Sequence, residues 1–116
     1  MSRDKKHALF IGRFQPFHEG HRYLCEQKIN EGIPVLIAIR DVEKDEKNPF
    51  TAEQVKFRIE DELKDWILHG KCKVIIIPDI EGFYYGRDVG YKVEQIHAPK
   101  EIQEISATKI RKEMGL

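Results

Sequence analysis

Two histidines three positions apart, His18 and His21, are the residues whose type and spacing best suit chemistry in this sequence. They end the stretch GRFQPFHEGH at residues 12–21, which follows an apolar run and precedes a helical pattern. In the first turn of a helix, both imidazoles would lie where unpaired backbone N–H groups and the helix dipole favour an anion. A lone histidine there would more often be a hydrogen-bonded structural residue. Two in this context predict a phosphate site.

Metal binding is a weaker interpretation of the same pair. Histidines at i and i+3 would need a second pair of ligands to hold zinc, and the sequence offers none at suitable spacing. The two cysteines, Cys25 and Cys72, have no C-x-x-C spacing, so we expect reduced, partly buried thiols and no disulfide.

A second stretch, ISATKIR at residues 105–111, combines hydroxyl and basic side chains. By itself it fits a solvated helix at residues 106–114 with Ser106 as its N-cap. Together with the histidines it also fits an anion site at a helix start, where Thr108 and Arg111 add a hydroxyl and a guanidinium.

The elements that must position these residues follow from the hydrophobic pattern. Apolar runs at 8–11, 35–39 and 74–77 predict buried strands, and helical patterns cover 18–30 and 51–69. Such alternation predicts an α/β fold, Rossmann-like, with a small parallel sheet between two helical layers (three-layer α/β/α) and right-handed crossovers. Ligands of this architecture bind at the carboxyl ends of strands, beside a switch in strand order.

Two expectations concern the rest of the chain. Residues 91–96 are expected to form a fourth, edge strand, which leaves pairing with a second copy open. We interpret residues 1–116 as one domain.

Composition limits the partners. Twenty basic and twenty acidic side chains give a net charge of zero, which argues against nucleic acid or a membrane surface as a partner. No apolar run approaches the roughly 20 residues of a membrane span, and the N-terminal residues show no signal-peptide pattern. A cytoplasmic protein is therefore expected.

The two stretches resemble the signatures of the nucleotidylyltransferase superfamily. Residues 12–21 are similar to its H-x-G-H signature, and residues 105–111 to its I-S-S/T-T-x-I-R signature, with Ala107 in place of the common Ser or Thr. The resemblance implies the fold of that superfamily (HUP type). It also implies an enzyme, a nucleotidyltransferase, in which a phosphate or phosphonate group of a small acceptor attacks the α-phosphorus of a nucleoside triphosphate and pyrophosphate leaves.

The same resemblance assigns roles to residues. His18 and His21 would contact the triphosphate, and Gly20 would allow close backbone approach. Arg111, with Ser106 and Thr108, would hold the β- and γ-phosphates. The nucleotide site would further include Gly12, Arg13, Phe14, Gln15 and Arg87. Phosphate or acceptor contacts could come from Arg40, Lys44, Lys47 and Asp79. Mg²⁺ would be held mainly by the nucleotide, without protein ligands.

Base and acceptor stay open at this point. GRFQPFH and residues 48–52 resemble archaeal-type nicotinamide mononucleotide adenylyltransferases, whereas the short chain is closer in size to small cytidylyltransferases. We therefore expect transfer of AMP or CMP, from ATP or CTP, to a small phosphorylated acceptor. The alternative is a non-catalytic nucleotide-binding module of the same fold.

Overall fold

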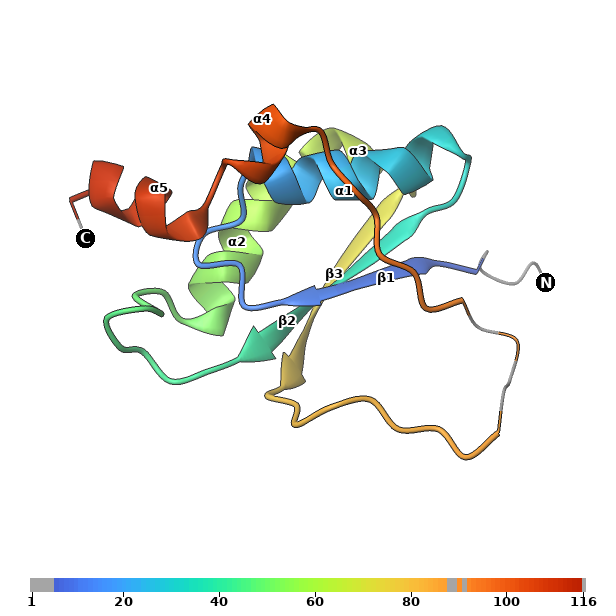
Figure 1. Ribbon diagram of the computed structural model, residues 1–116, viewed down its shortest axis with the longest axis horizontal. Coiled ribbons are helices and arrows are strands. Elements are labelled where there is room, and N and C mark those ends of the chain that lie inside the picture. The colour runs from blue at the N-terminus through green and yellow to red at the C-terminus, as the bar shows by residue number, and fades with distance from the viewer. Residues whose placement is uncertain (1–5, 88–89, 91, 116) are drawn as a thin grey trace.

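A computed structural model describes residues 6–87, 90 and 92–115 of the chain. Strands and helices alternate through residue 78, as the hydrophobic pattern predicts (Figure 1). The elements in chain order are β1 (Ala8–Gly12), α1 (Glu19–Asn30), β2 (Val35–Asp41), α2 (Ala52–Glu62), α3 (Lys64–Leu68), β3 (Cys72–Pro78), α4 (Lys100–Gln103) and α5 (Ala107–Glu113).

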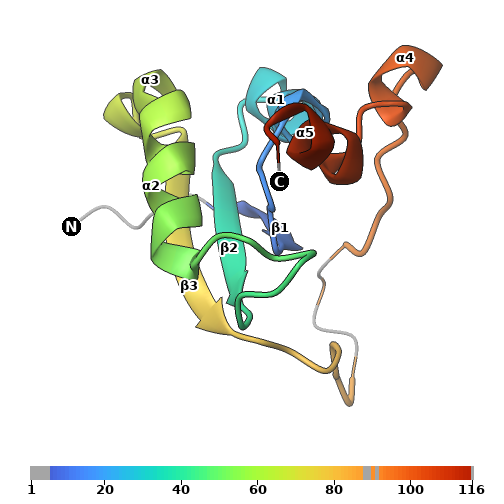
Figure 2. The ribbon, with the colours of Figure 1, turned by 90° about the vertical axis from the view of Figure 1, so that its left-hand side faces the viewer.

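The three strands form one parallel sheet in the order β1-β2-β3 (Figure 2). Phe10 lies beside Ile37, which lies beside Val74, so the same register row crosses all three strands. All three carboxyl ends therefore meet at one edge of the sheet. The prediction of a Rossmann-like α/β fold with a small parallel sheet is confirmed.

The buried core lies on one face of this sheet. Val35, Ile37 and Ile39 are fully buried there, and Cys25 of α1 and Ile59 of α2 pack against the same cluster. Both connections step in the same direction, β1 to β2 to β3, so two crossovers of the same hand place α1 and α2 on the same side. The expected second helical layer and the switch in strand order are thus absent from the described residues.

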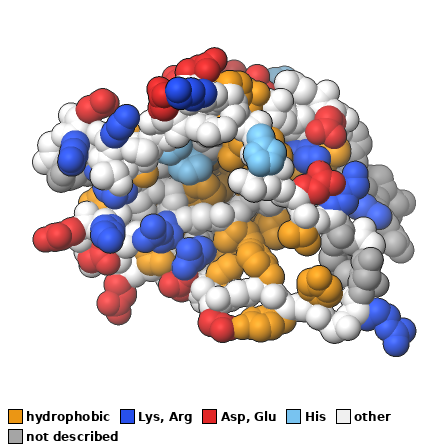
Figure 3. Space-filling view, in the orientation of Figure 1, with side chains coloured by type: hydrophobic (Ala, Val, Ile, Leu, Met, Phe, Trp, Pro, Cys, Tyr) orange, Lys and Arg blue, Asp and Glu red, His pale blue; other side chains and the backbone are white. Residues whose placement is uncertain are grey.

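The opposite face of the sheet carries apolar side chains that are only partly covered. Leu9 is 54% exposed and Ile75 is 39% exposed. Residues 79–87 run along this side of the sheet, and hydrophobic side chains show between them and the sheet (Figures 1 and 3). Parallel sheets are ordinarily covered on both faces, so this open face is unusual.

Two local predictions need correction. The single helix expected over 51–69 is divided at Leu63, where the backbone turns to φ −103°, ψ 23° and the side chain stays buried at 2% exposure. Residues 92–96 form no strand, and Tyr91 lies outside the described residues. Polar residues surround Val93, whose side chain is 91% exposed. The segment therefore buries too little apolar surface to stabilise an edge strand. The short helix α4 was not expected.

The ends of the helices follow sequence signals. In α2, Thr51 and Gln54 form the reciprocal capping box that their spacing predicts, and Ser106 caps α5. Gly32, at φ 80°, ends α1 in a Schellman motif: its N–H donates to the Ile29 carbonyl and that of Ile33 to the Lys28 carbonyl.

Both cysteines are free and buried. Burial raises the pKa of the Cys25 thiol to about 12 and that of Cys72 to about 11, so both thiols stay protonated at neutral pH. Across the described part of the chain, no helix has the length and apolarity to span a membrane.

Candidate functional site

The two histidines form the N-terminal cap of α1. His18 is the N-cap residue, in extended conformation, and its Nδ1 accepts a hydrogen bond of 3.0 Å from the Gly20 N–H. The Nδ1 of His21 accepts a bond of 3.1 Å from the His18 N–H, which completes a capping box made of two imidazoles. Because each Nδ1 is an acceptor, a neutral ring must carry its proton on Nε2.

Burial fixes the charge state of these rings. It lowers the pKa of His21 to about 3, and the adjacent His18 acts in the same direction. Burial also lowers the pKa of His18. The rings are stacked, with centroids 3.8 Å apart and planes 24° apart, so two positive charges would repel strongly there. The pair therefore offers two neutral Nε2–H donors, and its attraction for an anion comes from hydrogen bonding and the helix start.

The residues around the rings hold them in place. Phe14 contacts His21 edge-on, with centroids 5.0 Å apart, and Phe17 stacks on it at 5.4 Å. A Cβ on Gly20 would lie 2.8 Å from Cε1 of His18, so this glycine makes room for the imidazole. The sequence analysis predicted no role for Phe17. Two phenylalanines, at positions 14 and 17, so close to His18 and His21 were a signal that aromatic rings pack on the imidazoles.

The loop between β1 and α1 has a constrained shape. Phe14 has a positive φ of 52°, and a Cβ on Gly12 would lie 3.0 Å from its ring. Gly12 and Phe14 thus shape the loop and support His21, whereas Arg13 between them is exposed. Hydrogen bonds from Asn48 hold the pKa of Asp45 below its usual range and the Arg13 charge acts in the same direction, which places Arg13 near the loop after β2.

Gln15 is buried in the same loop, at 5% exposure. Its Nε2 donates to the Phe50 carbonyl and its Oε1 accepts from the Phe50 N–H, both at 2.9 Å. The side chain expected to contact a nucleotide is thus turned toward the backbone that precedes α2.

The C-terminal stretch meets the first loop through Arg111. Its Nη1 donates a hydrogen bond of 2.6 Å to the Gln15 carbonyl, across 96 positions of sequence, and its Nη2 lies 3.4 Å from the Thr108 hydroxyl. The Ser106 hydroxyl accepts from the Lys109 N–H as the N-cap of α5. The fold therefore brings together the two stretches that the sequence singled out.

His18 and Ser106 also line one cavity, of about 470 Å³. Its lining is acidic, because it includes Glu19, Glu62, Glu101, Glu104 and Glu113. Burial raises the pKa of Glu62. These carboxylates would repel a triphosphate, whereas Lys109, which also lines the cavity, would attract it.

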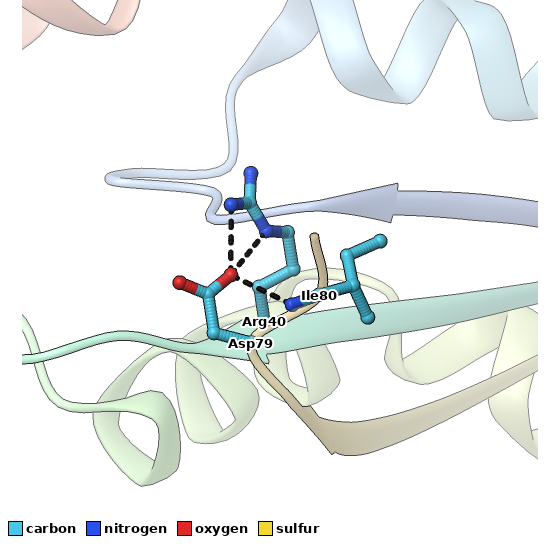
Figure 4. Close-up of polar contacts among 3 residues, drawn as sticks. All are labelled: Arg40, Asp79 and Ile80. Atoms are coloured by element: carbon cyan, nitrogen blue, oxygen red, sulfur yellow. Dashed lines mark hydrogen bonds and ion pairs between the residues drawn. The ribbon is translucent and has the colours of Figure 1, made fainter. Parts of the chain in front are cut away.

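Arg40 and Asp79 form an ion pair at the carboxyl ends of β2 and β3 (Figure 4). Nε and Nη2 of Arg40 each lie 2.7 Å from Oδ1 of Asp79, which also accepts from the Ile80 N–H. The expectation that either residue contacts phosphate or acceptor independently is therefore weakened, because the two charges neutralise each other.

Three expected cations are placed on exposed segments. Lys44 and Lys47 lie on the loop after β2, which the Asp45 carboxylate orders by accepting from the N–H groups of Lys47 and Asn48. Arg87 is exposed on the segment that follows β3. The lysines lie on the loop that follows the carboxyl end of β2, on a side of the molecule where Lys and Arg side chains gather (Figure 3).

The described side chains include no cluster of three or more His, Cys, Asp or Glu residues arranged to hold a metal ion. Any divalent cation at this site would depend on phosphate oxygens and water for most of its ligands.

No protein-family model matches the sequence. The chain is 39% identical over 75 residues to a nicotinamide-nucleotide adenylyltransferase of Methanospirillum hungatei, covering 63% of this chain and 42% of the relative. It is 40% identical over 76 residues to the protein of that name from Methanococcus aeolicus, covering 64% and 43%. A Methanolobus tindarius protein of the same name is 40% identical over 62 residues, covering 52% and 36%.

These matches span less than half the length of the relatives. Within that span, the similarity agrees with the resemblance that the two sequence stretches carry. The chain is thus similar to archaeal nicotinamide-nucleotide adenylyltransferases, on a Rossmann-like α/β fold.

Proposed function

We propose that this protein is a nucleotidyltransferase that transfers AMP from ATP to the phosphate of nicotinamide mononucleotide, with release of pyrophosphate. The observation that carries the proposal is the hydrogen bond from Arg111 to the Gln15 carbonyl, because it joins the C-terminal stretch to the loop that holds His21. The similarity to adenylyltransferases favours AMP over CMP and supports the nicotinamide nucleotide as acceptor.

The proposed chemistry needs no general base. A phosphate acceptor is already a nucleophile, so the protein has to align it and stabilise charge on the α-phosphate and the leaving pyrophosphate. The Nε2–H groups of His18 and His21 would donate to phosphate oxygens near the reacting phosphorus. The Arg111 guanidinium, which has further N–H groups beyond its bond to Gln15, would hold the β- and γ-phosphates with Ser106 and Thr108. Mg²⁺ would enter with the nucleotide and supply positive charge to its phosphates.

The activity is tested by measuring pyrophosphate release from ATP with nicotinamide mononucleotide and Mg²⁺, beside an arm with CTP and glycerol 3-phosphate. We expect turnover in the first arm. Turnover only with CTP would correct the base, and its absence in both arms would refute the proposed pair of substrates.

A matched pair of variants tests the role of Arg111. Arg111→Ala should weaken ATP binding at least about tenfold, as expected for loss of a charged hydrogen-bonding partner, whereas Lys112→Ala, on an exposed position of the same helix, should not. Equal affinities in calorimetry would remove the C-terminal stretch from the site.

His21→Asn tests the neutral donor. Asparagine can keep an acceptor near the position of Nδ1 for the His18 N–H, yet it lacks the Nε2–H group. We expect turnover to fall about 10²- to 10³-fold, the usual cost of one oxyanion donor, with the circular dichroism spectrum unchanged.

A second candidate function is a nucleotide-binding module without turnover. The ion pair between Arg40 and Asp79 favours it, since it neutralises one of the cations expected near the strand ends. ATP binding by calorimetry with no pyrophosphate release across a panel of phosphorylated acceptors would support this candidate over the first.

A further inference from the structure

Gln15 is one of two polar side chains, with Asn48, that are almost fully buried in loops of the described chain, each at 5% exposure. Long polar side chains are rarely buried unless their polar atoms are bonded. Here the amide makes two bonds with one residue, donating to the Phe50 carbonyl and accepting from the Phe50 N–H at 2.9 Å each. The side chain therefore fastens the β1–α1 loop to the segment just before α2.

The backbone of Gln15 has a second long-range partner. Its carbonyl oxygen accepts the 2.6 Å bond from Nη1 of Arg111, so three segments that are 35 and 96 positions apart meet at one residue. The flanking rings of Phe14 and Phe17 pack on His21 from the same loop. A shift of this loop would move both the carbonyl that receives Arg111 and the rings that hold His21.

We infer that Gln15 is the positioning residue of the site: its amide fixes the loop against Phe50, so that its carbonyl holds Arg111 and α5 against the loop that leads to the histidines. The role given to Arg111 and His21 rests on the proposed function, whereas the positioning of α5 does not. Gln15 acts through these residues and makes no contact with the nucleotide itself.

The chemistry of the two bonds with Phe50 defines an informative variant. In Gln15→Glu, one carboxylate oxygen still accepts from the Phe50 N–H, but the other faces the Phe50 carbonyl, and two acceptors repel. Protonation of the carboxyl group restores a donor at that position and thus both bonds. Burial and the facing carbonyl favour the protonated form of such a carboxyl group, whereas the guanidinium groups of Arg111, bonded to the carbonyl of residue 15, and of Arg58, over the Phe50 ring, favour the ionised form. A lower pH shifts this balance toward the protonated form.

The matched control is Gln27, which lies on α1 and whose Nε2 donates to the Tyr23 carbonyl at 3.1 Å. Gln27→Glu makes the same chemical change to a glutamine that bonds to backbone, without any link to α5 or to the first loop.

The first measurement follows kcat/KM for ATP from pH 8 to pH 5.5. We expect Gln15→Glu to lose roughly 10- to 100-fold at pH 8, the size of effect that misplacement by about an ångström produces. The deficit relative to the wild type should shrink as the pH falls, whereas Gln27→Glu should follow the wild type throughout. Wild-type activity of Gln15→Glu at pH 8 would overturn the inference.

A second measurement separates this inference from the proposed function. Gln15→Leu removes both bonds to Phe50, and we expect hydrogen exchange in α5, read at the amides of Ile110 and Met114, to accelerate several-fold while exchange in β2 stays unchanged. These amides donate to the carbonyls of Ser106 and Ile110. If the wild type shows no turnover but α5 exchanges faster in the variant, the proposed function fails and the positioning role stands. Unchanged exchange in α5 would overturn the positioning role whether or not the wild type is active.

Discussion

Residues 6–78 and the described residues from 79 onward differ in how they are held. The first region contains the sheet and every described residue of the buried core cluster. In the second region, Phe83, Tyr84 and Tyr85 are each more than 70% exposed. The radius of gyration, 15.0 Å, exceeds the roughly 13 Å typical of a compact domain of this length. The first region therefore carries the fold, whereas the second is attached to it.

This difference divides the candidate site. His18 and His21 are fixed by the capping box and by the packing of Phe14 and Phe17 within the first region. Arg111 belongs to the second region and reaches the loop through its bond to the Gln15 carbonyl. The pair of histidines is thus preorganised, whereas the position of Arg111 depends on a junction made by few contacts.

The largest contrast between the regions should appear in stability. Ile59 is fully buried in the core, and we expect Ile59→Ala to lower the free energy of unfolding by about 2–5 kcal/mol. Val93 is 91% exposed, so Val93→Ala should change it by less than about 0.5 kcal/mol. Urea denaturation measures both. A comparable loss at Val93 would mean that the second region contributes packing of its own.

A second effect, smaller for each pH unit, should come from His21, which lies in α1 of the first region. Its pKa is lowered from 6.5 to about 3 by burial and by His18, so the unfolded chain takes up a proton at a higher pH than the folded chain does. The stabilising contribution of the neutral ring is complete above pH 6.5 and is lost as the pH falls from 6.5 toward 3, by up to about 1.4 kcal/mol per pH unit.

The test compares unfolding free energies at several pH values in that range. Carboxyl groups titrate there too, so the informative quantity is the difference between the wild type and His21→Asn, with His97→Gln, on an exposed position, as the control. A pH dependence in His21→Asn as steep as in the wild type would show that this ring is not the group responsible.

The smallest effect should come from the pair of Arg40 and Asp79, where the second region begins. Their side chains are 32% and 48% exposed, and a pair so accessible to solvent should contribute about 0.2–1 kcal/mol. A double-mutant cycle with Arg40→Gln and Asp79→Asn measures the coupling, which should diminish in 1 M salt. A coupling well above this range would mean that the pair helps to fix the second region to the sheet.

Local features of the sequence predicted much of the first region. Apolar runs predicted the three strands, and Thr51 with Gln54 predicted the start of α2, because strand burial and helix caps depend on neighbouring residues. The pattern could not say what covers each face of the sheet: Leu9 and Phe10 are both apolar, yet Leu9 is 54% exposed while Phe10 packs on the core. Strand order decides that, and it is not a local property.

The candidate site shows the same division. The sequence by itself determined that two imidazoles lie at a helix start and that a hydroxyl-rich stretch with an arginine follows near the C-terminus, because residue types and short spacings are enough for that. Only the tertiary structure decided that Gln15 bonds to Phe50, that Arg40 is paired with Asp79 and that Arg111 reaches the first loop. Each of these joins residues at least 35 positions apart, and such contacts arise from the path of the chain through the sheet.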